Sequence, residues 1–262
     1  MATAAPKAVP QARTVEPTFV FGADLSGDFA GPTASVAQKH FRADSDIGVG
    51  PSGGAYAIPY RDSAGALLGF GALSPHIQGF LAHARAHPEE VFLVARFGCE
   101  PGALGDVDMA RQFTHLPPNV LLQGLWQRAN DPKFGVRLLI FDPFARFKEE
   151  YWQVKLKRFL SLNAATCNGG KVELVSVGPA RSVVANDQCA RKLGFKHRVF
   201  GANEANFGKD AQTVADMKAM WYSTHFLSLC DFKQTVQPQQ FRFTTDAIRA
   251  GLTVEQLENE LD

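Results

Sequence analysis

The sequence predicts an α/β protein built from two doubly wound, mainly parallel domains in tandem. Apolar runs of strand length alternate with amphipathic segments of helix length along most of the 262 residues. The segments between successive apolar runs are long enough for helical crossovers, which join parallel strands. This alternation stops near residue 123 and starts again near residue 136. We therefore expect two Rossmann-like domains, at residues 18–128 and 135–232, with a flexible arm at each end of the chain.

The first domain is expected to contain four strands separated by three helices. Pro32 fits the first turn of one helix, and Ser74 followed by Pro75 is a typical cap and first turn of the next. The glycine-rich stretch 48–54 is expected to be a loop. The predicted elements are strands at 18–22, 55–59, 91–97 and 119–122 and helices at 32–41, 73–87 and 107–113.

The second domain repeats the pattern after a linker at about residues 123–135. A helix that ends before Gly194 is favoured by the freedom of glycine at a helix C-terminus. The predicted elements are strands at 136–141, 172–177, 196–200 and 225–230 and helices at 146–162, 181–193 and 213–223.

The two ends of the chain lack this periodicity. Residues 1–17 are rich in alanine and proline, and they are expected to form a flexible N-terminal arm. Residues 233–262 begin with a polar stretch that proline interrupts, and they are expected to form a C-terminal arm. Within it, Thr253-Val-Glu-Gln256 matches a capping box, which predicts a short acidic helix.

Composition excludes several classes of partner. The formal net charge is +1 and no basic run is present, which argues against binding to nucleic acid or to an anionic membrane. No apolar run reaches about 18 residues, so no membrane-spanning helix is predicted. The four cysteines lie far apart in sequence and do not have zinc or redox-motif spacing, which predicts free thiols in a reducing compartment. Phenylalanine is abundant, at 21 residues, and is expected in cores or at an interface.

Glycine-bearing loops follow three of the strands predicted in the first domain, at 22–31, 48–54 and 98–105. In a doubly wound sheet, loops at the carboxyl ends of strands form the ligand site, and glycine lets backbone N–H groups approach a phosphate. Taken alone, each loop is better explained by a tight turn between strand and helix. The three loops together make an ancestral nucleotide site as good an explanation as three such turns. The candidate ligand-binding residues in this domain are Gly22, Asp24, Gly27, Gly31, Gly98 and Cys99.

Five short motifs in the first domain resemble a family of small phage and bacterial proteins of unknown activity. These motifs are Val20-Phe-Gly-Ala-Asp-Leu-Ser-Gly27, Tyr56-Ala-Ile-Pro59, His87-Pro88, Phe92-Leu-Val-Ala-Arg-Phe-Gly-Cys99 and Pro117-Pro-Asn-Val120. The resemblance implies a macro-like arrangement of glycine loops, of the kind that binds ADP-ribose. The chain departs from the family at Asp24 and Glu100, where a carboxylate would repel a phosphate. The family also implies a phage or mobile-element context.

The second domain resembles the YspA-like branch of the SLOG superfamily, whose Rossmann-like domains bind nucleotides. The matching stretches are Gly178-Pro-Ala-Arg-Ser-Val-Val184 and Ala202 to Met217. The family's acidic residue is Val184 here, its second glycine is Gln212, and its Arg-Asn pair is Ala215-Asp216. These replacements remove polar groups that would hold a phosphorylated ligand. The resemblance leaves four candidate ligand-binding residues: Gly178, Arg181, Gly208 and Lys209.

Other polar residues have ordinary explanations. His76, His83 and His87 form a stripe beside an apolar helix face, but no carboxylate or cysteine completes a metal set, so a solvated flank is expected. Cys99 is expected to be a buried thiol, because no base is identifiable near it. Asp106 and Asp108 are expected to cap the N-terminus of the helix that they precede and to interact favourably with its dipole. No catalytic residue, metal or cofactor is predicted.

Three functions remain open from the sequence. The first, which we favour, is a non-catalytic protein that uses two degenerate nucleotide-binding folds for binding or assembly through its arms, with itself or with protein partners. The second is a sensor of an ADP-ribose-like or NAD-like nucleotide, and the third is a nucleotide-processing enzyme. Loss of motif residues in both domains favours the first. The expected location is the cytoplasm of a bacterial host cell or a virion, as the family resemblance implies.

Overall fold

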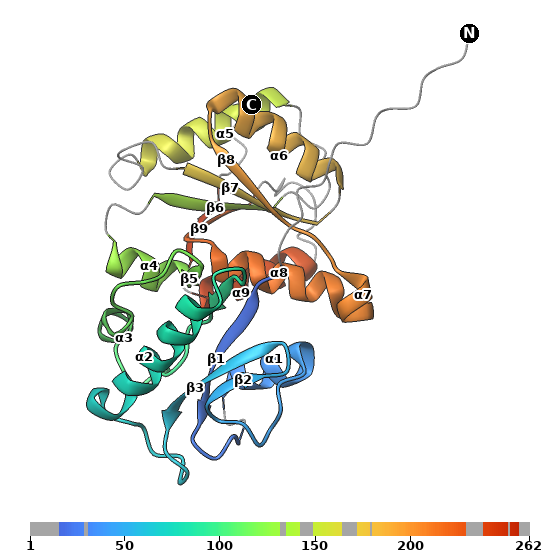
Figure 1. The fold of residues 1–262 in the computed structure, drawn as a ribbon. Coiled ribbons are helices and arrows are strands. Elements are labelled where there is room, and N and C mark those ends of the chain that lie inside the picture. The colour runs from blue at the N-terminus through green and yellow to red at the C-terminus, as the bar shows by residue number, and fades with distance from the viewer. Residues whose placement is uncertain are drawn as a thin grey trace.

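The computed structural model describes residues 16–28, 31–131, 135–141, 149–163, 172–178, 180–228, 238–250 and 252–256. It is an α/β structure with two mainly parallel sheets of five strands each, which confirms the predicted α/β class and the mainly parallel pairing (Figure 1). We call the sheet of the N-terminal half sheet A and that of the C-terminal half sheet B.

Sheet A has the strand order β2-β3-β1-β4-β5. All neighbouring pairs are parallel except β2 and β3, which form an antiparallel hairpin. Helices α2, α3 and α4 contribute to the core on one face, and α1 lies on the other. The elements are β1 (Thr18–Asp24), α1 (Pro32–Phe41), β2 (Gly50–Ser52), β3 (Ala55–Arg61), α2 (Phe70–Ala86), β4 (Phe92–Val94), α3 (Asp106–Gln112), β5 (Val120–Leu122) and α4 (Gly124–Asn130).

Three expectations for the N-terminal half are wrong. Part of the loop expected at 48–54 is strand β2, because the chain turns back there to pair with β3. Helix α2 begins at Phe70 rather than after Ser74, so Pro75 lies inside it, at the cost of one helical hydrogen bond. The expected linker contains α4, which is ordered by the burial of the Trp126 ring in the core of sheet A.

Sheet B has the strand order β10-β9-β6-β7-β8, and every neighbouring pair is parallel. Helices α5 and α6 cover one face, and α8 and α9 cover the other. The elements are β6 (Val136–Phe141), α5 (Glu149–Leu162), β7 (Val172–Val177), α6 (Ala180–Leu193), β8 (Lys196–Phe200), α7 (Glu204–Phe207), the 3-10 turn η1 (Gly208–Asp210), α8 (Ala211–Tyr222), β9 (His225–Ser228), α9 (Pro238–Arg249) and β10 (Thr253–Gln256).

The C-terminal segment departs from its expectation. Thr253–Gln256 is not the start of a helix but strand β10, which pairs in parallel with β9. Helix α9 precedes it and buries Phe243 and Ala247 in the core of sheet B. Pairing along the free edge of β9 and this burial outweigh the local capping signal. Residues 238–256 therefore include part of sheet B rather than a separate arm, whereas residues 1–15 and 257–262 lie outside the described residues.

Helix α8 lies between the two sheets (Figure 1). It connects β8 to β9 within sheet B, and its residues Ala215 and Ala219 pack in the core of that sheet. On the side of sheet A, Val214 belongs to the same core as Phe19, and Trp221 stacks on the Phe19 ring at 4.5 Å. The boundary at residues 130–135 therefore separates the sheets along the chain but not their cores.

Candidate functional site

The structure brings two of the three predicted glycine loops, 22–31 and 98–105, together at the carboxyl edge of sheet A. Gly22 and Asp24 end strand β1, and Gly98 and Cys99 follow the adjacent strand β4. At this point the chain passes to α1 on one face of the sheet and to α2 and α3 on the other. Doubly wound sheets bind ligands where the connections diverge in this way.

Close packing explains the glycines at this edge without a ligand. A Cβ atom at Gly22 would lie 2.5 Å from the Cβ of Phe97, and one at Gly27, where φ is +85°, would lie 2.5 Å from the Ser45 carbonyl oxygen. The neighbourhoods of Gly31 and Gly98 are less tight. Their Cβ atoms would lie 3.0 Å and 3.1 Å from atoms of the Tyr60 side chain, which separates the two loops.

Asp24 is buried and orders its own loop. Its Oδ1 accepts hydrogen bonds from the Ser26 hydroxyl and from the Asp28 N–H, each at 2.8 Å. The sequence analysis expected this carboxylate to repel a phosphate. In the structure, it accepts the hydrogen bonds that stabilise a local turn.

A second carboxylate, Asp106 of α3, connects the segment that follows β4 to helix α4. It accepts two hydrogen bonds from the Arg96 guanidinium, at 2.7 and 2.8 Å, and one from the Trp126 indole at 2.8 Å. Burial alone would raise the pKa of the Asp106 carboxyl, but these hydrogen bonds hold it below its usual value. The expected cap is corrected: Asp106 lies in the first turn of α3, but the N-cap is Gly105 and the Asp106 side chain contacts other elements.

The Cys99 thiol lies beside this ion pair and is buried. Burial raises its pKa to about 12, and the Asp106 charge acts in the same direction. The thiol is therefore protonated at neutral pH and is not an activated nucleophile, in agreement with the sequence expectation.

Tyr60, Arg61 and Glu100 form a cluster at this edge that sequence reasoning did not identify. The Tyr60 hydroxyl donates to Glu100 Oε1 at 3.3 Å, and the Arg61 guanidinium carbon lies 5.1 Å from the centre of the Tyr60 ring. Arg61 Nε and Glu100 Oε2 are buried atoms that have no hydrogen-bond partner among the described residues. Forty residues separate Tyr60 from Glu100, so no local pattern could have connected them.

The candidates of the C-terminal half lie around the carboxyl edge of sheet B. Gly178 follows β7 with φ at +102°, and Arg181 is the second residue of α6. Gly208 and Lys209 lie between α7 and α8, and Lys209 is exposed. The chain segments that follow β6 and β9, where the connections of this sheet diverge, are residues 142–148 and 229–237, which lie outside the described residues, as does the Arg181 side chain.

A serine, a histidine and an aspartate line up beneath α6. The Ser176 hydroxyl lies 2.9 Å from His197 Nε2, and His197 Nδ1 lies 3.3 Å from Asp187 Oδ1. This is the connectivity of a hydrolase triad. However, Ser176 has no exposed surface, and its hydroxyl also accepts a hydrogen bond from Asn186 at 2.7 Å. The group connects α6 to β7 and β8 and offers no path for a substrate.

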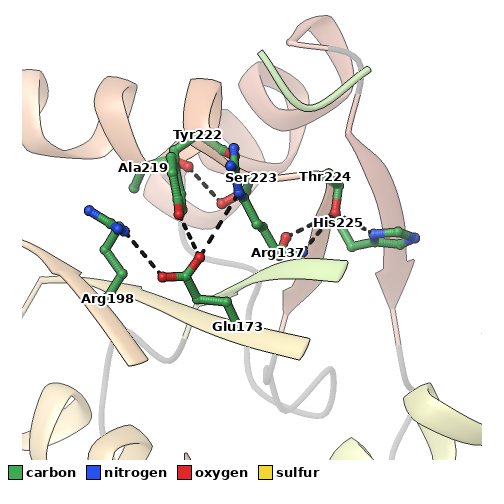
Figure 2. Close-up of polar contacts among 8 residues, drawn as sticks. All are labelled: Arg137, Glu173, Arg198, Ala219, Tyr222, Ser223, Thr224 and His225. Atoms are coloured by element: carbon green, nitrogen blue, oxygen red, sulfur yellow. Dashed lines mark hydrogen bonds and ion pairs between the residues drawn. The ribbon is translucent and has the colours of Figure 1, made fainter. Parts of the chain in front are cut away.

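Two arginines and a tyrosine stack at the amino end of sheet B, against the end of α8 (Figure 2). The guanidinium carbons of Arg137 and Arg198 lie 3.9 Å and 4.8 Å from the centre of the Tyr222 ring. Glu173 accepts from the Tyr222 hydroxyl at 2.5 Å and from Arg198 at 3.2 Å. These contacts attach the C-terminal end of α8 to strands β6, β7 and β8.

The histidine stripe on α2 contacts aromatic side chains. The His83 ring lies 4.1 Å from that of His87 and 5.0 Å from that of Tyr56, measured between ring centres. No group of three or more histidine, cysteine or acidic residues that could hold a metal ion is present within the described parts of the chain.

Comparisons with protein-family models, with curated proteins and with solved structures find no match to this chain. Both resemblances inferred from sequence motifs therefore stay predictions. No helix among the described residues is long and apolar enough to cross a membrane.

Proposed function

We propose that this chain is a non-catalytic protein that uses two Rossmann-like units, joined through α8, for binding or assembly. The strand order of sheet B supports the Rossmann-like description. Numbered within its own half it is 3-2-1-4-5, all parallel, which is the order of a doubly wound nucleotide-binding fold. Because fold alone does not define function, the proposal depends on the site.

The observation that carries the proposal is the engagement of polar groups at the carboxyl edge of sheet A. Asp24 is held by its own loop, Asp106 is shared by Arg96 and Trp126, and the Cys99 thiol is protonated. An enzyme needs an accessible acid, base or nucleophile with a pKa suited to its task. These groups instead stabilise the packing of loops and helices, as expected of a protein that uses its fold for binding or assembly rather than for catalysis.

Calorimetry tests the binding half of the proposal. ADP-ribose, NAD and ATP are each expected to bind more weakly than about 100 μM, which corresponds to about −5.5 kcal/mol. A micromolar dissociation constant for any of the three would contradict it.

Sedimentation tests the assembly half. Removal of residues 2–15, which keeps the first described residue Glu16, is expected to leave the melting temperature of the isolated protein almost unchanged. The same removal is expected to weaken incorporation into an oligomer or phage-encoded particle, measured by co-sedimentation. If the truncated protein assembles as well as the intact chain, the arm has no role in assembly.

One observation favours the sensor as a second candidate. Arg61 Nε and Glu100 Oε2 are a donor and an acceptor without partners at the predicted ligand edge, and a buried polar group is normally satisfied by protein, water or ligand. The hydroxyl groups of a ribose can both accept from such a donor and donate to such an acceptor. If calorimetry detects ADP-ribose, Glu100→Gln is expected to weaken binding at least about ten-fold, while Asp108→Asn, at an exposed position on α3, serves as the matched control.

A further inference from the structure

Lys218 is a buried lysine at the junction of the two halves. It lies on α8, and its side chain is only 4% exposed. Its ammonium nitrogen lies 5.2 Å from the centre of the Phe41 ring and 4.7 Å from that of Phe207. Phe41 ends α1 and Phe207 ends α7, and their rings meet edge to face at 5.7 Å. The charge is therefore held by two aromatic faces from different halves of the chain.

Glu16 provides the opposite charge. Its carboxylate forms an ion pair with Lys218, and its Oε2 accepts a hydrogen bond from Asn203 at 3.4 Å. Glu16 lies two residues before β1, the central strand of sheet A. The ion pair thus connects the chain that enters sheet A to the helix that both sheets share.

The aromatic contacts continue from Lys218 into the core. Phe41 stacks on Phe19 at 4.7 Å, and Phe19 stacks on Trp221, which lies one turn of α8 after Lys218. The Lys218 ammonium group therefore lies next to the aromatic rings that pack β1 against α8.

Another pair of titratable residues lies on the elements that pack around Lys218. On α1, His40 Nδ1 lies 3.6 Å from Asp210 of η1. Burial lowers the pKa of His40, and the nearby Lys39 lowers it further, so this histidine is neutral above pH 7. Within the described part of the chain, the opposite charge in direct contact with Lys218 is therefore Glu16.

We propose that Glu16 and Lys218 form a proton-dependent clasp, which holds the chain entering β1 against α8 and opens when Lys218 loses its proton. A neutral amine would lose both the ion pair and the attraction to the two rings. Glu16, whose side chain is 37% exposed, could then turn to solvent at little cost. Burial lowers the pKa of Lys218 to about 8, so opening is expected in mildly alkaline solution.

Cleavage by trypsin after Arg13 tests the clasp in the full-length chain. This bond lies three residues before Glu16, and a protease needs several residues on each side of the bond in extended form. Cleavage rates are divided by those of a peptide with the sequence of residues 7–18, which removes the pH dependence of the protease. The relative rate of the wild-type protein is expected to rise at least about five-fold between pH 7 and pH 9.5.

Two variants separate the clasp from a general loosening of the fold. Glu16→Gln removes the charge at a partly exposed position, and its relative rate is expected to be high at pH 7 and to change less than about two-fold by pH 9.5. Lys218→Met keeps an unbranched side chain without charge and is expected to behave in the same way, if it retains the wild-type circular dichroism. A wild-type rate that does not change with pH, or a Glu16→Gln protein that keeps the wild-type pH dependence, would overturn the proposal.

Discussion

Separating the two halves of the chain provides the strongest test of the packing of α8. If the chain is cut between residues 131 and 135, the N-terminal fragment keeps all strands of sheet A and helix α1. It loses the side chains of α7 and α8 that complete the cover of one face. Phe19 loses Trp221, Phe41 loses Phe207, and Leu93 loses the core that it shares with Ala215 and Ala219. Exposing a buried side chain of this size costs about 1.5–3 kcal/mol, so these three together cost about 4–9 kcal/mol. A domain has only about 5–15 kcal/mol of stability in total.

We therefore expect the fragment of residues 16–131, expressed alone, to show no cooperative thermal transition by circular dichroism and to bind a hydrophobic dye. Co-expression with residues 135–262 is the matched control, and it should restore one cooperative transition. Cooperative unfolding of the isolated N-terminal fragment, with native near-ultraviolet dichroism, would refute the idea that α8 completes the core of sheet A. The sequence predicted two fragments that fold independently, so this experiment distinguishes the two views directly.

Three further predictions concern single residues. Burial, with a smaller contribution from Arg128, lowers the pKa of His225 from 6.5 to about 4. Between these two pH values the unfolded chain binds more protons than the folded chain. The free energy of unfolding should therefore fall by about 3 kcal/mol as the pH falls from 6.5 to 4. Urea unfolding of wild type and His225→Gln across this range measures the effect, and equal pH dependence of the two would contradict it. Gly124→Ala would place a Cβ atom 2.0 Å from the Ser223 carbonyl oxygen. Denaturant unfolding should show that this variant loses about 3 kcal/mol or more of unfolding free energy. The control Gly79→Ala, which has open space around the new Cβ atom on α2, should be neutral or slightly stabilising. Because it is protonated and buried, Cys99 should react with iodoacetamide in the folded protein at least about a hundred-fold more slowly than in urea, as mass spectrometry of its peptide would show.

Local sequence patterns predicted most elements because their signals are local. Strands β6 and β7 and helix α1 have the bounds that the sequence indicated, since apolar runs and a proline at the first helical turn define them. The gathering of Gly22 and Gly98 at one edge also follows from parallel pairing, which places the carboxyl ends of neighbouring strands side by side.

The errors involve contacts between residues far apart in the chain. The segment 253–256 has a local signal for a helix start, and only the edge of β9 makes it a strand. The sharing of α8 between the sheets depends on Val214 and Trp221 finding Phe19 across about 200 residues, which no window of sequence contains. The same limit applies to the site: Tyr60 and Glu100, like Ser176 and His197, are ordinary residues until the fold brings them together.

The burial of the Tyr222 ring at the end of α8 has a spectroscopic consequence. Burial raises the pKa of this phenol to about 12, and it also raises the pKa of Tyr56 and Tyr60. Three of the four tyrosines therefore resist ionisation while the chain is folded. In an alkaline titration followed by ultraviolet absorbance, most of the phenolate band should develop late and abruptly, when the core opens. The tyrosines are thus built-in reporters of alkaline unfolding, and they need no added label.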